Sequence, residues 1–165
     1  MQALTKGPTK EQDIKSVLEP NARIYAYTKG DAEAEGSKVV TCQLPVINKI
    51  ARVLFDSGAT HSFISAMFTN CLDRSNDNIT QTFRTVLPSG DIMLSNYWLR
   101  VVTVVMCERE SSVDLVVLDM VDYDVILGMD FLSKYGATID CKAKVVSFQP
   151  LGEERFMFVG DRCSS

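Results

Sequence analysis

The feature that most constrains the fold of this chain is a succession of short, strand-like segments that begins near Lys38. In the first segment Val40, Cys42, Leu44 and Val46 alternate with polar residues or proline, and this period of two places one face of a strand on a core. Further segments of this kind cover 49–55, 80–87, 92–106, 113–120, 123–127, 138–141, 144–148 and, more weakly, 155–159. Many short strands with little helix predict an all-β sandwich or barrel.

Two hairpins and one short helix complete the expected fold. The connection around Asn48 and the run Pro88–Asp91 each lie between two strand-like segments, and proline and glycine in the second favour a tight turn. Residues 130–135 can form a helix whose start is capped by Asp130.

The length of 165 residues allows one domain of ordinary size with tails. Residues 1–37 carry glycine, proline and an acidic stretch, and only Ile24–Tyr27 offers apolar anchoring, as a short strand or docking segment. We therefore predict a flexible linker or arm over 1–37, one domain over 38–149, and a C-terminal strand and tail over 150–165.

The charge balance argues against a nucleic-acid-binding role. Lys and Arg number 17 against 21 Asp and Glu, which gives a net charge of -4 with no basic block. Such a surface is a poor match for phosphate backbones, so no direct nucleic-acid binding is expected, and the mixed charge of residues 1–37 makes an RNA-binding arm a weak alternative.

The sequence also indicates an intracellular protein. Its longest apolar run, Val101–Cys107, is far shorter than the roughly 20 residues that cross a bilayer, and the N-terminus lacks the apolar region of a signal peptide. The five cysteines, at positions 42, 71, 107, 141 and 163, are odd in number and form no Cys-x-x-Cys pair. We expect reduced thiols, no membrane association, and a cytoplasmic or nuclear location.

The most informative single residue is a carboxylate directly after a buried strand. Asp56 follows the apolar residues 53–55, and Ser57 and Gly58 then turn the chain so that backbone N–H groups face the carboxylate. Taken alone, Asp-Ser-Gly is most often an ordinary turn that closes a strand. Apolar residues on both sides, as far as Ile64, indicate that this turn is buried, where an isolated charge is costly.

One carboxylate cannot act as acid and base on a peptide bond at the same time. Two carboxyl groups about 3 Å apart share one proton, so that one accepts a proton from water while the other donates a hydrogen bond to the carbonyl. The chain holds one Asp-Ser-Gly, and a symmetric homodimer would supply the second at its two-fold axis.

Three linked segments carry a family resemblance. Residues 53–65, Val-Leu-Phe-Asp-Ser-Gly-Ala-Thr-His-Ser-Phe-Ile-Ser, resemble the active-site segment of retropepsin-like aspartic proteases, in the form found in gypsy-type LTR retrotransposons of plants. Residues 123–132 resemble the second signature of that family, which passes beside the catalytic loop into its single helix, and 136–140 fit the continuation. Pro88-Ser89-Gly90 stands where the family has its flap, and 22–26 resemble the stretch that joins a zinc knuckle to the protease.

The resemblance covers about residues 38–149 and implies a retropepsin-like closed β-barrel with one short helix and one half-site per chain. It implies an aspartic endopeptidase that works as a homodimer on the polyprotein of its own element, without a metal or other cofactor.

The same resemblance implies roles for individual residues. Asp56 would be the catalytic carboxylate, Ser57 would hydrogen-bond across the dimer axis, and Gly58 would permit the tight loop that Ala59 and Thr60 continue. Gly90 would donate backbone hydrogen bonds to the substrate. The remaining implied residues support the site: Pro88, Ser89 and Asp91 at the flap, and Ile126, Leu127 and Gly128 beside the loop.

Other sites have weaker support. His61 next to Ser62 suggests a Ser-His-Asp triad, but sequence neighbours rarely face each other as a triad requires, so a partly exposed loop histidine is favoured. Asp119, Asp122 and Asp124, with Asp130, lack the spacing of a calcium loop and are better explained by turns, a helix cap and solubility.

The main rival function is a dimerisation or protein-binding module on the same fold that cleaves nothing, since fold alone does not establish activity.

Overall fold

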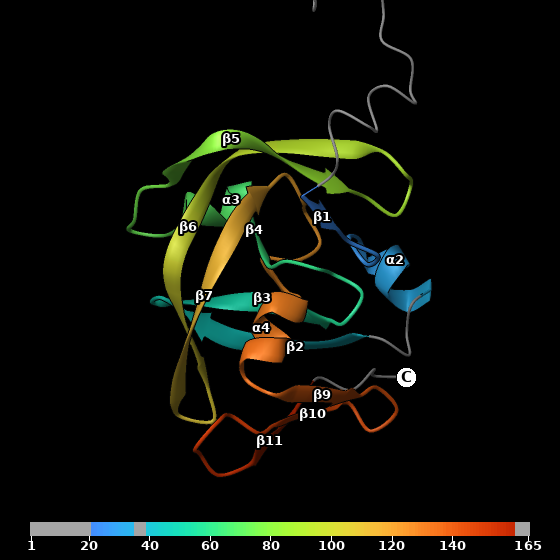
Figure 1. Cartoon of the computed structure of the whole chain (residues 1–165), viewed down its shortest axis with the longest axis vertical. Coiled ribbons are helices and arrows are strands. Elements are labelled where there is room, and N and C mark those ends of the chain that lie inside the picture. The colour runs from blue at the N-terminus through green and yellow to red at the C-terminus, as the bar shows by residue number, and fades with distance from the viewer. Residues whose placement is uncertain (1–20, 35–38, 161–165) are drawn as a thin grey trace, which may run out of the picture.

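The computed structural model describes residues 21–34 and 39–160, and its main feature is one twisted sheet that closes on itself (Figure 1). The strand order is β1-β5-β6-β2-β3-β8-β4-β7, and β6 also pairs with β7, which joins six strands into a ring. The elements of this sheet and its connections are β1 (Ala22–Arg23), α2 (Lys29–Ala34), β2 (Val39–Val46), β3 (Lys49–Asp56), β4 (Phe63–Ser65), α3 (Ala66–Thr69), β5 (Asp77–Val86), β6 (Ile92–Met106), β7 (Arg109–Leu118) and β8 (Val125–Leu127). The expected all-β barrel is confirmed.

The last part of the described chain forms a separate small sheet below the ring (Figure 1). It follows α4 (Met129–Lys134) and consists of β9 (Ala137–Asp140), β10 (Val145–Phe148) and β11 (Phe156–Val159) in the order β11-β10-β9. The ring of Phe148 stacks on that of Phe156 with centroids 4.9 Å apart, and Phe148 also meets Phe131 of α4 edge to face. These contacts attach the small sheet to the main core.

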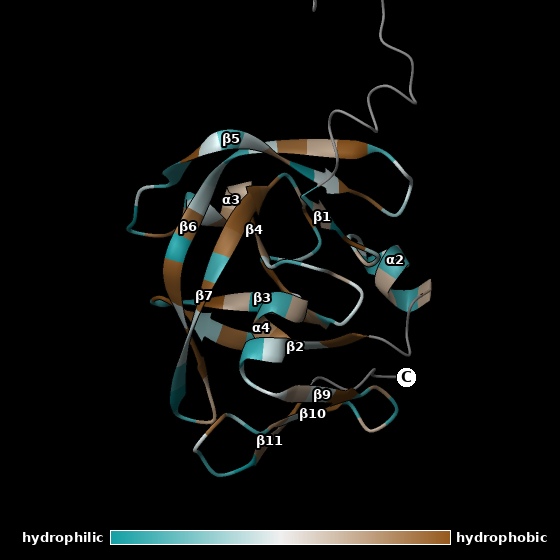
Figure 2. Cartoon of the chain, in the orientation of Figure 1, coloured by the Kyte–Doolittle hydropathy of each residue, from teal (hydrophilic) through white to brown (hydrophobic). Residues whose placement is uncertain are grey.

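The barrel strands have two hydrophobic clusters, one on each face of β3. Phe55 and Val53 belong to the main cluster inside the ring, whereas Leu54 packs on the other side with Ile126 and Phe63. The end of β3 is therefore buried on both faces, as its unbroken apolar run predicts. Figure 2 shows the contrasting pattern in β6, where hydrophilic and hydrophobic segments alternate along a strand with one exposed face.

Part of the predicted arm belongs to the folded domain. Residues 1–20 and 35–37 of that arm lie outside the described residues, but Ala22, Ile24, Ala26 and Ala32 are buried members of the second cluster. Their alternation with exposed residues is the period of two of a half-buried strand, too short to predict against the polar composition around it. The structure thus differs from an arm over 1–37 at residues 21–34.

The predicted helix is present, with a different cap. Gly128, and not Asp130, is the N-cap residue of α4, and Asp130 lies in the first turn, where its carboxylate accepts a hydrogen bond from Ser62. The structure also contains α2 and α3, which the sequence did not predict, because helices of six and four residues are too short to show a helical period. Among the described residues, no helix is long and apolar enough to cross a membrane.

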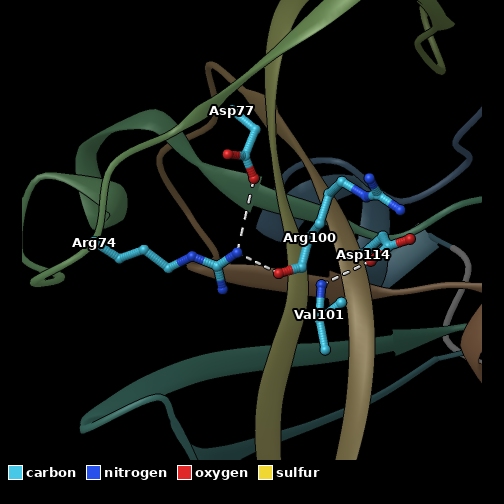
Figure 3. Close-up of polar contacts among 5 residues, drawn as sticks. All are labelled: Arg74, Asp77, Arg100, Val101 and Asp114. Atoms are coloured by element: carbon cyan, nitrogen blue, oxygen red, sulfur yellow. Dashed lines mark hydrogen bonds and ion pairs between the residues drawn. The ribbon is translucent and has the colours of Figure 1, made fainter.

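A bulge interrupts the pairing in the middle of β6, and Figure 3 shows the polar contacts around it. The β6–β7 register shifts between Leu99 and Val102, and Val101 has a φ of 53°, which is unusual for a β-branched residue. The Val101 N–H donates to Oδ1 of Asp114 at 2.8 Å, and the Arg74 guanidinium donates to the carbonyl of Arg100. These side chains satisfy backbone groups that the bulge removes from the ladder.

Candidate active site

Asp56 is the last residue of β3 and lies at the end of a parallel strand pair. Leu54 pairs with Ile126 and Phe55 with Leu127, so β8 supports the strand immediately before the carboxylate. Only 1% of the Asp56 surface is exposed. A carboxylate in so apolar a setting requires hydrogen-bond donors, because its desolvation is otherwise costly.

Two backbone amides donate to this carboxylate. The N–H of Gly58 donates to Oδ1 at 2.8 Å, and the N–H of Ala26 donates to Oδ2 at 3.2 Å. The Ala59 N–H closes the turn by donating to the backbone carbonyl of Asp56 at 3.1 Å. Hydrogen bonds of this kind stabilise the charged form of a carboxylate and fix its orientation.

The turn after Asp56 leaves little room for a side chain at position 58. A Cβ on Gly58 would lie 2.9 Å from Cδ2 of Tyr25 and 3.1 Å from Oδ1 of Asp56, both closer than side chains normally approach. Glycine therefore allows the backbone to approach the carboxylate and its N–H to donate to it.

The rest of the loop is held from two sides. The Thr60 N–H donates to the carbonyl of Arg23 at 3.0 Å, and the Arg23 N–H donates to Oγ1 of Thr60 at 2.9 Å. Ala59 is fully buried, and its carbonyl accepts the N–H of Met129 at 2.7 Å. Ser57 is exposed at the tip of the loop.

The second segment that the sequence singled out packs against this loop. Ile126 and Leu127 are fully buried. A Cβ on Gly128 would lie 2.2 Å from the carbonyl oxygen of His61 and 2.7 Å from that of Ala59, which no side chain allows. The structure thus brings together Asp56, the loop after it and Gly128, which are far apart in the sequence.

The hairpin at 88–91 connects β5 to β6. Pro88, Ser89, Gly90 and Asp91 are exposed, and the turn closes through hydrogen bonds from Gly90 N to the Leu87 carbonyl and from Leu87 N to the Asp91 carbonyl, at 2.9 and 2.8 Å. Gly90 has a φ of 92°, which favours glycine. Strand β1 lies between the hairpin and the loop, because it pairs with β5 while Arg23 bonds Thr60.

The weaker alternative sites are not assembled. The His61 ring contacts Thr60 through Nδ1 at 3.0 Å and lies edge-on to Phe83, while the Ser62 hydroxyl donates to Asp130 at 2.6 Å. No Ser-His-Asp triad therefore exists here. Asp122 and Asp124 accept backbone N–H groups of Lys29 and Arg52, and residues 21–34 and 39–160 contain no group of three His, Cys, Asp or Glu that could hold a metal.

Tyr25 and Ala26 are the site residues that the sequence did not identify. They reach Asp56 and Gly58 from about thirty positions upstream. The available signal was that the small or apolar residues Ala22, Ile24 and Ala26 alternate with other residues. This pattern predicts that one side of the segment is buried, but it does not indicate which part of the protein that side contacts.

Comparison with known proteins relates this chain to one family. A family model described as retroviral aspartyl protease matches residues 20–154. The retroviral protease-like domain of Ddi1 from Leishmania major superposes with a TM-score of 0.57 at 12% identity, over 76% of this chain and 95% of that chain. The EIAV protease complexed with the inhibitor HBY-793 superposes with a TM-score of 0.47 at 22% identity, over 60% of this chain and 89% of that chain.

No match was found among curated protein sequences. The family match spans most of the chain, includes the Asp56 loop and the Gly128 segment, and agrees with the closed β-sheet and with the fold of the Ddi1 domain. The chain belongs to the retroviral aspartyl protease family.

Proposed function

We propose that this chain is an aspartic endopeptidase that acts as a homodimer, with one Asp56 from each copy. The observation that carries the proposal is the position of Asp56 at the buried end of β3, with a backbone N–H on each carboxylate oxygen. Membership of the retroviral aspartyl protease family supports the same function. Its substrate would be the polyprotein of a plant gypsy-type retrotransposon, inside the cell.

The mechanism needs two carboxyl groups that share a proton. The ionised Asp56 accepts a proton from a water molecule as the water oxygen attacks the peptide carbonyl carbon, and the protonated Asp56 of the other copy donates to the carbonyl oxygen. The same pair then delivers a proton to the departing amine as the C–N bond breaks. No metal or cofactor takes part in these steps.

The remaining loop residues position this pair. Gly58 holds one Asp56 oxygen through its N–H, and Ser57, exposed at the loop tip, would hydrogen-bond to the second copy. Gly90 at the tip of the 88–91 hairpin would donate backbone hydrogen bonds to the substrate peptide. Ala59 and Gly128 fix the loop against the start of α4, and Thr60 fixes it against β1.

A catalytically silent dimerisation module on the same fold is the alternative. The observation in its favour is that Asp56 is almost completely covered by the chain itself. The two functions differ in what happens when the carboxylate loses its charge, because only an enzyme requires it.

Cleavage of a peptide library at mildly acidic pH, across a protein dilution series, tests the proposal. Asp56→Asn should abolish cleavage and retain dimerisation, whereas Asp73→Asn, a change at an exposed aspartate, should leave both intact. Specific activity should fall on dilution, because each site needs two chains. Absence of cleavage in a folded and dimeric sample would support the silent module.

A further inference from the structure

Residues 21–34 cross the Asp56 loop as a continuous segment, which we call the strap. At one end β1 pairs with β5, and Arg23 bonds Thr60. In the middle Ala26 donates to Asp56. At the other end the Lys29 N–H donates to Oδ2 of Asp122 at 2.7 Å, and the Tyr27 hydroxyl donates to the carbonyl of Asp119. Figure 1 shows β1 and α2 on the side toward which the β3–β4 loop projects.

The strap occupies the space that the proposed reaction requires. Two catalytic carboxyl groups must come within about 3 Å of each other to share a proton. Here the Ala26 N–H lies 3.2 Å from Oδ2 of Asp56, Tyr25 covers Gly58, and Asp56 is 1% exposed. A second Asp56 or a substrate carbonyl cannot reach the carboxylate while Tyr25 and Ala26 are in place.

We propose that the strap is autoinhibitory: it competes with a second copy of this chain for the Asp56 loop, and it must leave the loop before the two-chain site can form. This inference rests on the proposed homodimeric protease and adds how that site is regulated. The strap keeps a single copy closed, so activity depends on concentration through two linked equilibria, strap release and dimerisation.

The strap is held at its α2 end by contacts that are suited to reversible release. Asp31, in the first turn of α2, accepts the N–H groups of Tyr27 and Thr28 just before the helix at 3.3 and 3.0 Å, and Asp122 accepts that of Lys29. Ala32 is the one buried residue of α2 among those described. Each lost hydrogen bond of this kind changes the closed-to-open ratio by about fivefold.

Release of the strap and dimerisation are coupled, and the size of this coupling can be calculated. Both copies must open before they dimerise, so the apparent dissociation constant equals the intrinsic one divided by the square of the open fraction. A fivefold rise in a small open fraction therefore tightens the dimer by up to about 25-fold. A change that stabilises α2 should weaken the dimer in the same way.

The experiment measures the dimer dissociation constant by sedimentation and the amide exchange of residues 24–29 by mass spectrometry, both on the full chain. The double variant Asp31→Ala with Asp122→Ala should exchange faster and dimerise at least about tenfold more tightly. Gly30→Ala should do the reverse, because its Cβ would meet only Thr28 Oγ1 at 3.8 Å and alanine favours helix. Asp140→Ala, which removes a turn contact to Ala143 N in the small sheet, is the matched control and should change neither.

The measurements distinguish failure of the strap proposal from failure of the proposed protease function. Faster exchange at Ala26 with an unchanged or weaker dimer overturns the strap, and so does unchanged exchange in both the double variant and Ala26→Pro, which removes the donor to Asp56. A tighter dimer that still cleaves no peptide supports the strap and contradicts the proposed enzymatic function.

Discussion

The Ser62 hydroxyl links the loop after Asp56 to the start of α4: it accepts the N–H of Gly128 at 3.0 Å and donates to Oδ1 of Asp130 at 2.6 Å. Ser62 and Gly128 are buried, so the Gly128 N–H cannot turn to water if the hydroxyl is removed, whereas the exposed Asp130 carboxylate can. Because Gly128 also packs against the Ala59 carbonyl, this one hydroxyl helps to hold the two segments that form the site.

Ser62→Ala should lower the free energy of unfolding by about 1–3 kcal/mol, because it leaves the Gly128 N–H buried without its acceptor and removes the donor to Asp130. Urea unfolding followed by circular dichroism measures the change. Ser89→Ala, at an exposed turn, is the control and should change stability by less than about 0.5 kcal/mol. Equal stability of both variants would contradict the role of the hydroxyl.

Gly128→Ala should be more damaging than Ser62→Ala. The added methyl group would lie 2.2 Å from the His61 carbonyl oxygen, and backbone on both sides has to move to relieve that contact. We expect a loss of more than about 3 kcal/mol of stability or failure to fold, measured by thermal unfolding. Gly152→Ala is the comparison without a clash: nothing lies within 4 Å of its Cβ, so its cost comes from its φ of 77° alone and should be smaller than that of Gly128→Ala.

Gly90→Ala tests the hairpin without a steric clash, because nothing lies within 4 Å of the new Cβ. Its φ of 92° makes alanine strained there, so the turn should be destabilised by about 1 kcal/mol. If the hairpin binds substrate, peptide cleavage should fall mainly through a higher KM, while global stability changes little. A lower kcat at constant KM would argue against this role.

Val101→Gly should stabilise the fold by about 1 kcal/mol. Val101 is 67% exposed and has a φ of 53°, so glycine relieves backbone strain and gives up little buried surface. Its N–H bond to Asp114 is retained. Val105→Gly, at a regular position of the same strand, should instead destabilise, and both changes can be read from chemical unfolding curves.

The folded protein should lose stability in alkali because Tyr123 is buried. Its burial raises the pKa of the phenol above 10.0, an effect that Asp122 increases and Arg52 opposes. Because the folded pKa is the higher one, the stabilising contribution is complete below the unfolded pKa of about 10 and is lost as pH rises through the folded value. Unfolding of wild type and Tyr123→Phe between about pH 8 and about pH 11 should show a smaller decline in the variant.

Much of the barrel could be predicted from the sequence, because its long strands have a clear period. The segments predicted around β2, β3, β5, β6, β7 and β10 are present with small shifts at their ends. Strands β1 and β4 were not predicted, since two and three residues are too few to show alternation. They exist because neighbouring strands supply their hydrogen bonds.

The candidate site was predictable only in part. Asp56, Ser57 and Gly58 stand out because a charged residue follows a buried strand, and their proposed roles stay predictions. The contact of Gly128 with the loop depends on parallel pairing of β3 and β8, which local pattern does not encode. Nor does any local signal place Ala26 on Asp56, because the two residues meet only through the packing of the second hydrophobic cluster.

Strand β1 has a mechanical consequence that follows from its two sets of partners. Ala22 and Arg23 pair with Thr85 and Val86 at the base of the 88–91 hairpin, and Arg23 is also bonded to Thr60 in the loop. A displacement of the hairpin base should therefore also displace the loop, because the two residues of β1 are bonded to both. Force applied to the hairpin is thus transmitted through β1 to the segment that covers the carboxylate.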